Sequence, residues 1–182
     1  MHPRRAANPF RSFLVSALLL AAAVLGAPAR ADDYAEVQRL QAAGHNAEAL
    51  ALVDRYISER PRDPQMRFLK ANLLSGTGHA DEAQTLLIQL TRDYPELAEP
   101  WNNLAVLYAG QGKLEQARDA LHDALRVQPD YATALENLGD VQVRLALQAY
   151  QGARRVDAGN ARVATKIESL RKLSSDAGKP AN

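Results

Sequence analysis

The sequence has 182 residues, of which 47% are apolar, 24% charged and 5% aromatic, and its formal net charge is +1. This apolar fraction excludes an intrinsically disordered chain, and the lack of cysteine excludes disulfides, thiolate metal sites and cysteine nucleophiles. The charge is unevenly placed: residues 32–143 hold 10 basic and 18 acidic residues, and residues 144–182 hold 8 basic and 3 acidic. Because the acidic body would repel phosphate, we expect no nucleic-acid partner.

Residues 1–31 have the pattern of a secretory signal peptide. Arginines precede an uncharged apolar run at residues 13–25, and the small residues Ala29 and Ala31 then form a cleavage motif. We predict a cut between Ala31 and Asp32, export to a bacterial periplasm and no stable membrane anchor after cleavage. The alternative is a retained membrane anchor, but a helix of 13 residues is about 20 Å long against a hydrocarbon core of about 30 Å.

The body of the sequence repeats with a period of 34 residues. In the unit at 98–131, apolar residues follow Trp101 with helical spacing, Gly112 interrupts the pattern, and Ala117 opens a second apolar face that ends before Pro129. Each unit therefore predicts two antiparallel helices. Three residue classes keep this spacing over three cycles: Gly44, Gly78 and Gly112; Ala49, Ala83 and Ala117; and Pro61, Pro95 and Pro129.

Residues 100–129, PWNNLAVLYAGQGKLEQARDALHDALRVQP, carry the clearest form of this unit. They resemble the tetratricopeptide repeat family, and the resemblance extends over about residues 32–160. It implies an all-α solenoid of helix–turn–helix repeats, because each helical pair has an apolar face that only the next pair can cover. The expected parts are the leader 1–31, a solenoid 32–173 with units at 32–63, 64–97, 98–131 and 132–160 and a capping helix at 161–173, and a disordered tail at 174–182.

The fourth unit lacks five residues, including the turn glycine, because only 7 residues separate Gly139 from Ala146 where 12 separate Ala105 from Ala117. We therefore predict one fused helix over residues 132–157. Val143, Leu147 and Tyr150 form a second apolar strip along it. A neighbouring helix of the same chain is the favoured cover for this surface, and an oligomer contact through these three residues is the alternative.

No constellation for catalysis or metal binding stands out. His45 and His79 follow turn glycines, and His122 lies beside two aspartates, so no histidine pair has the spacing of helical metal ligands. Serines lack a nucleophile motif. We expect a protein that is not an enzyme, with no cofactor and no metal.

The resemblance implies that the first helix of each unit lines a concave groove that binds peptide segments. Chaperone-binding members of the family pair groove asparagines with cations, but here Phe68, Thr133 and Asn137 stand at the cationic positions. The groove is thus expected to prefer neutral or basic segments. The implied groove residues are Phe68, Asn72, Asn102, Val106, Glu136 and Asp140, with Asn103 and Asn137 at the edge.

The sequence thus predicts a non-enzymatic adaptor or assembly factor of the bacterial cell envelope, whose partners are other proteins or peptide segments. The alternative is a structural protein that self-assembles into homo-oligomers through the strip on the fused helix.

Overall fold

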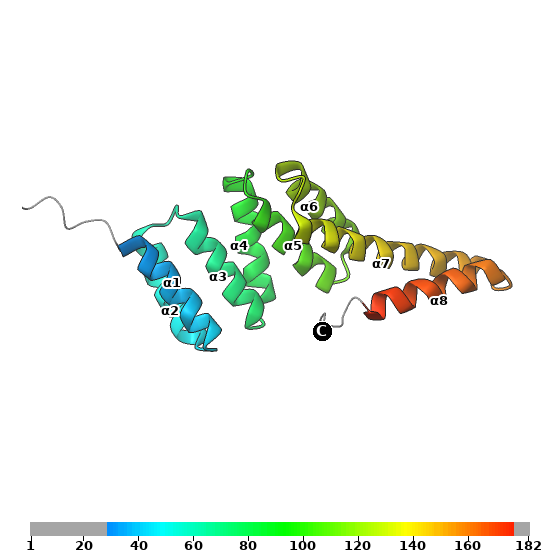
Figure 1. Ribbon diagram of the computed structural model, residues 1–182, viewed down its shortest axis with the longest axis horizontal. Helices are drawn as coiled ribbons and strands as arrows, with labels where there is room; N and C mark the ends of the chain where they lie inside the picture. The colour runs from blue at the N-terminus through cyan, green and yellow to red at the C-terminus, as the bar shows by residue number, and fades with distance from the viewer. Residues whose placement is uncertain (1–28, 177–182) are drawn as a thin grey trace, which may run out of the picture.

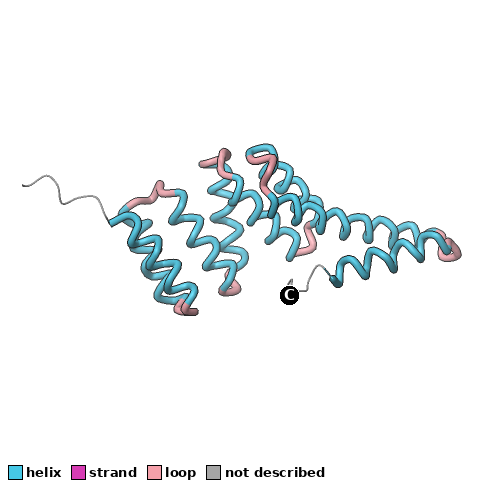
Figure 2. The backbone as a smooth tube through the Cα atoms, in the orientation of Figure 1, coloured by secondary structure: helices cyan, strands magenta, loops and turns pink. Residues whose placement is uncertain are grey.

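The protein is built from helices stacked along one axis, with no strand in residues 29–176, the part that the computed structural model describes (Figures 1 and 2). Helical hairpins stand side by side through most of the molecule, and the last two helices extend along its long axis. The helices are α1 Ala29–Ala42, α2 Asn46–Glu59, α3 Pro64–Gly76, α4 Ala80–Asp93, α5 Ala98–Gly110, α6 Leu114–Val127, α7 Ala132–Val156 and α8 Ala161–Asp176.

Glycine sets the turn inside each of the first three hairpins. Gly44, Gly78 and Gly112 have φ angles of 77°, 86° and 75°, and no other described residue has a positive φ. L-residues with a side chain adopt this conformation at a cost of about 1–2 kcal/mol, so the turns require glycine there. The 34-residue spacing of these glycines is therefore the spacing of the hairpins, as predicted.

Proline and a capping aspartate define the turns between hairpins. Helices α2, α4 and α6 each end two residues before a proline of the repeat. Asp63 caps α3 by accepting hydrogen bonds from the backbone N–H groups of Gln65 and Met66. The Tyr34 hydroxyl donates to the other oxygen of this carboxylate. Burial of the Tyr34 hydroxyl, and to a lesser degree this hydrogen bond, raise the pKa of Tyr34. One side chain thus fixes α1 against the start of α3.

The core is a series of apolar clusters, each shared by adjacent hairpins. In the first, Val37 and Val53 of the first hairpin pack with Met66 of the second. The next joins Leu87 of α4 to Leu104 of α5. The buried members of the last cluster are Ala105, Ala117, Ala120, Leu121, Ala124, Ala134 and Val141. Since each cluster spans two hairpins, the hairpins stabilise one another in the manner of a solenoid.

Helix α7 is continuous, as the shortened fourth unit predicts. It has 25 residues, so it is roughly 37 Å long, whereas the helices of the first three hairpins have at most 14. Residues 140–151 contain neither glycine nor proline, so nothing in this segment interrupts a helix. Helix α8 then packs back along the second half of α7 (Figure 1).

The first and last helices do not begin and end at the expected boundaries. The capping helix was expected to end at residue 173, with a disordered tail from 174, but α8 continues to Asp176. The Ser-Ser-Asp segment that follows Leu173 contains no helix breaker, and the first one is Gly178. Residues 177–182 and 1–28, which include most of the predicted leader, lie outside the described residues. Helix α1 starts at Ala29, before the predicted cleavage bond.

Among the helices of residues 29–176, none combines the length and the apolar character that crossing a membrane requires.

Candidate functional site

A ladder of four asparagines connects the first helices of three successive units. Asn103 of α5 donates through Nδ2 to Oδ1 of Asn72 on α3 at 2.8 Å. Asn102 donates to Oδ1 of Asn103 at 3.1 Å, and Asn137 of α7 donates to Oδ1 of Asn102 at 2.9 Å. The ladder shows that α3, α5 and α7 present one shared face, as expected for the inner face of a solenoid.

The ladder changes the role expected for Asn102. We expected this residue to line a groove and to grip a peptide backbone, but its side chain is only 3% exposed. Its carbonyl oxygen and its amide are both bonded to neighbouring asparagines, which lie 35 residues away and next to it in the chain. Asn102 is therefore a structural link between units, and its buried side chain leaves little surface for a ligand.

Replacing Asn102 with alanine is expected to lower the free energy of unfolding by about 1–2 kcal/mol, because two hydrogen bonds disappear and their partners stay unpaired in a poorly hydrated place. Urea unfolding followed by circular dichroism measures the change. Asn72→Ala is the matched control: it stands at the end of the ladder, is half-buried and forms one of the ladder bonds. An equal loss for the two variants would contradict the structural role of Asn102.

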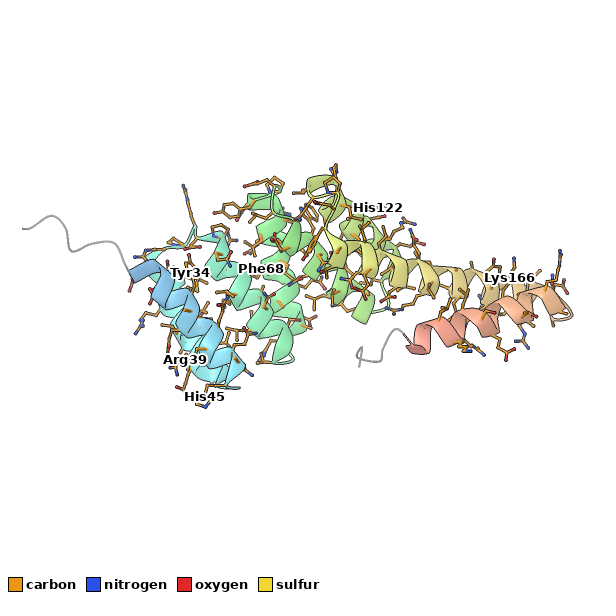
Figure 3. All side chains as sticks on the ribbon, viewed as in Figure 1. Tyr34, Arg39, His45, Phe68, His122 and Lys166 are labelled. Carbon is orange, nitrogen blue, oxygen red and sulfur yellow. The ribbon has the colours of Figure 1, made fainter. Side chains whose placement is uncertain are left out.

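Phe68 is also less available than predicted. Its side chain is half-buried and packs against the cluster of Leu87, Leu90 and Leu104 between the second and third hairpins (Figure 3). Helix α4 packs against both α3 and α5, and the ring lies against the cluster that these helices share. Phe68, which was expected to face the groove, is therefore partly a core residue with one exposed side.

Other predicted residues do meet at one cleft. Val106 of α5 is 51% exposed, and it lines a cleft of about 260 Å³ together with Asn137, Asp140 and Val141 of α7. Glu136 is exposed one turn before Asp140 on the same helix, although it does not line the cleft. The cleft thus combines an exposed apolar side chain with a carboxylate on the shared face of α5 and α7.

Arg144 is a cleft residue that the sequence pattern did not single out. Its Nη2 donates to the backbone carbonyl of Ala109 at 2.9 Å, near the end of α5. A cation at this position interacts favourably with the negative end of the α5 dipole, and its hydrogen bond satisfies one of the last carbonyls of α5. The signal was present, because Glu136, Asp140 and Arg144 follow each other at four-residue steps on one helix face.

The strip of Val143, Leu147 and Tyr150 is half-buried on the second half of α7. Tyr150 is covered from the same chain: Lys166 of α8 donates to its hydroxyl oxygen at 3.2 Å and lies 4.9 Å from the ring centroid. At Tyr150 the cover is thus a neighbouring helix.

Histidines and acids do not gather into a metal site within residues 29–176, where no group of three or more His, Asp or Glu side chains is suitably placed. His45 and His79 precede α2 and α4, and His122 is exposed on α6.

Two tetratricopeptide repeat models match the sequence, one over residues 40–105 and one over residues 98–131, and together they span about half of the chain. No curated protein matches the sequence. Among solved structures, a thermophilic TPR protein from Thermus thermophilus is 23% identical, with a TM-score of 0.58 over 81% of this chain and 84% of that one.

Two structures of TPR domains are similar in fold as well. The Sgt2 TPR domain from Aspergillus fumigatus is 18% identical, with a TM-score of 0.61 over 68% of this chain and 82% of its own. The first TPR of Spaghetti (RPAP3), solved with the HSP90 peptide SRMEEVD, is 15% identical, with a TM-score of 0.59 over 64% of this chain and 92% of its own. At these identities the likeness is one of fold.

Proposed function

The chain belongs to the tetratricopeptide repeat family, and from this premise we propose that it is a non-enzymatic adaptor or assembly factor that binds a peptide segment in the groove formed by α3, α5 and α7. The fold supports a role in protein–protein interaction in general. The narrower proposal depends on one observation: half of the Val106 side chain is open to solvent beside an unfilled cleft and the Asp140 carboxylate.

The contacts at this cleft favour an apolar side chain as the central anchor of the ligand. Val106 and Val141 supply carbon surface, and the cleft of about 260 Å³ has room for one large side chain. Burying an exposed apolar surface of this kind stabilises a complex by about 25 cal/mol for each Å² removed from water. The asparagine ladder keeps α5 and α7 in register, so the cleft is formed before the ligand arrives.

The charge at the cleft favours a neutral or basic segment. Asp140 and Glu136 are exposed on α7 without an ion-pair partner among the described residues. The one cation that lines the cleft, Arg144, already donates to the carbonyl of Ala109. An acidic segment would meet these carboxylates without compensation, whereas a lysine or arginine of a ligand would pair with Asp140.

We place this activity in the bacterial cell envelope. The arginines, the apolar run and the small residues of positions 1–31 support export through a cleavable leader. Mass spectrometry of the exported protein is expected to find Asp32 as the first residue, and a full-length mass in the envelope fraction would contradict cleavage.

A photo-crosslinking residue at position 106 tests the groove. In periplasmic extract, it is expected to form adducts with one or a few proteins, because a ligand in the cleft lies against this position. The control carries the same residue at position 122, an exposed site on α6 outside the cleft. Adducts that are equally abundant at both positions would contradict binding in the groove.

A charge variant then tests the preference with the segment so identified. Asp140→Lys is expected to weaken binding by about tenfold, because a carboxylate that faces the ligand is reversed in sign. Glu96→Lys makes the same change of net charge in the exposed loop between α4 and α5 and should leave the affinity unchanged. Fluorescence anisotropy of the labelled segment measures both.

A further inference from the structure

The helical hairpin made by α7 and α8 has a groove of its own, distinct from the cleft beside Val106. It has a volume of about 610 Å³, and its walls are predominantly apolar. Ala146 and Tyr150 of α7 form one wall, and Leu170 of α8 lies on the other. This groove exists because the fourth unit lost its turn, so α8 packs on the second half of α7 and the pair extends away from the stack (Figure 1).

Two cations border this groove. Arg162 and Lys166 belong to its lining and are exposed on α8. Figure 3 shows Lys166 on this hairpin, far along the molecule from Phe68. The Lys166 ammonium lies beside the Tyr150 ring and donates to its hydroxyl oxygen at 3.2 Å. An ammonium has three donors, so this contact leaves donors for a ligand that enters the groove.

The charge balance differs between the body and the hairpin. Residues 33–143 hold 10 basic and 17 acidic residues, and Arg39, Arg67, Lys70, Arg118 and Arg126 form ion pairs with carboxylates. In residues 144–176, seven cations accompany only three carboxylates. Among the described residues of that segment, Arg154, Arg155, Arg162, Lys166 and Arg171 form no ion pair. The hairpin therefore carries a positive field that its own acids do not neutralise.

We propose that the α7–α8 groove is a second docking site, which binds an acidic amphipathic peptide segment of a partner protein. Apolar side chains of the segment occupy the surface of Tyr150 and Leu170, and its carboxylates pair with Arg162 and Lys166. Apolar lining beside two cations favours a segment that carries both apolar and acidic side chains. With an acidic groove on α5 and α7 and a basic groove on the hairpin, one molecule holds two segments of opposite charge.

A synthetic probe tests this site in the full chain. The probe is a fluorescein-labelled peptide in which glutamates alternate with leucine and phenylalanine, and its binding is followed by anisotropy. We expect saturable binding that weakens with added salt. Two further peptides, one with lysine in place of glutamate and one with alanine in place of leucine and phenylalanine, should bind at least about tenfold more weakly. Equal binding of all three would overturn the proposal.

Matched variants locate the bound probe. The double variant Arg162→Glu and Lys166→Glu is expected to weaken binding by about tenfold or more. Arg154→Glu with Arg171→Glu changes the charge of the same hairpin equally, but neither residue lines the groove, so a much smaller change is expected. Thr165→Trp fills the groove without a change of charge and should also abolish binding. Equal losses for the two double variants, or full binding by Thr165→Trp, would overturn a specific site.

Two last measurements distinguish this groove from the cleft beside Val106 and from a membrane-binding surface. Val106→Asp alters the cleft on α5 and should leave the affinity for the acidic probe unchanged. A result against peptide binding at the Val106 cleft can therefore be told apart from a result against peptide binding at the α7–α8 groove. Sedimentation with phosphatidylglycerol vesicles is expected to leave the protein in solution. Strong vesicle binding together with no peptide binding would assign the basic hairpin to a membrane surface and overturn the proposal.

Discussion

Replacing Leu87 with alanine is expected to lower the free energy of unfolding by about 3 kcal/mol, within the range of about 2–5 kcal/mol for such changes at buried sites. Leu87 of α4 is 1% exposed and packs with Ala71 of α3 and Leu104 of α5. Its loss removes apolar contacts and leaves a cavity that this dense cluster closes only in part. Urea unfolding followed by circular dichroism measures the change.

Leu135→Ala is the control for this experiment, because it removes the same atoms from a side chain that is 50% exposed. We expect a loss below about 1 kcal/mol there. Because Leu87 lies between two hairpins, its loss weakens the contact between them and makes unfolding of the solenoid less cooperative. The apparent m value, which is the dependence of the free energy of unfolding on urea concentration, should therefore fall as well. Equal destabilisation by the two variants would contradict the central place of the α3–α4–α5 cluster.

Replacing Ala146 with proline is expected to cost about 3 kcal/mol or more, because proline removes the hydrogen bond to the carbonyl of Gln142 and its ring collides with that carbonyl. Ala146 lies inside α7, more than two turns from either end. The variant therefore breaks the fused helix in its interior. Helix content by circular dichroism and the urea midpoint should both fall.

Ala132→Pro is the matched control for the continuity of α7. Ala132 is the first residue of the helix, and its backbone N–H has no acceptor within the helix. Proline, which has no N–H, therefore loses no helical hydrogen bond at this position. The preceding residue, Tyr131, already has an extended backbone with φ −71° and ψ 92°, which a following proline favours. We expect a change within about 0.5 kcal/mol. If the two prolines had equal effects, α7 would not be one continuous helix.

The fold was largely predictable because its determinants are local. A turn glycine, a proline after each second helix and an apolar face of helical spacing each act within a few residues, so the positions of the hairpins follow from the sequence. The missing turn between Gly139 and Ala146 predicted the fused helix for the same reason, and the helix ends within one residue of the expected position.

The candidate site was predicted less well, because it depends on which helices meet. Val106, Asn137 and Asp140 do share a cleft, since the family pattern places them on one face. The burial of Asn102 as a link between units was not foreseen, because its partner Asn137 is 35 residues away and only the packing of α5 and α7 brings the two amides together. Arg144 was missed although it continues the four-residue spacing of Glu136 and Asp140, because its partner is a backbone carbonyl of another helix.

By itself, then, the sequence determined the repeat, the helices, the acidic body and the basic end of this protein, since each of these is a property of residues near one another in the chain. Only the tertiary structure decided which cations meet carboxylates of other helices. Arg67 pairs with Asp93 over 26 residues, while Arg162 and Lys166 line a groove whose lining residues include no carboxylate. Charge pairing requires approach within a few ångströms, and the packing of separate helices sets that approach.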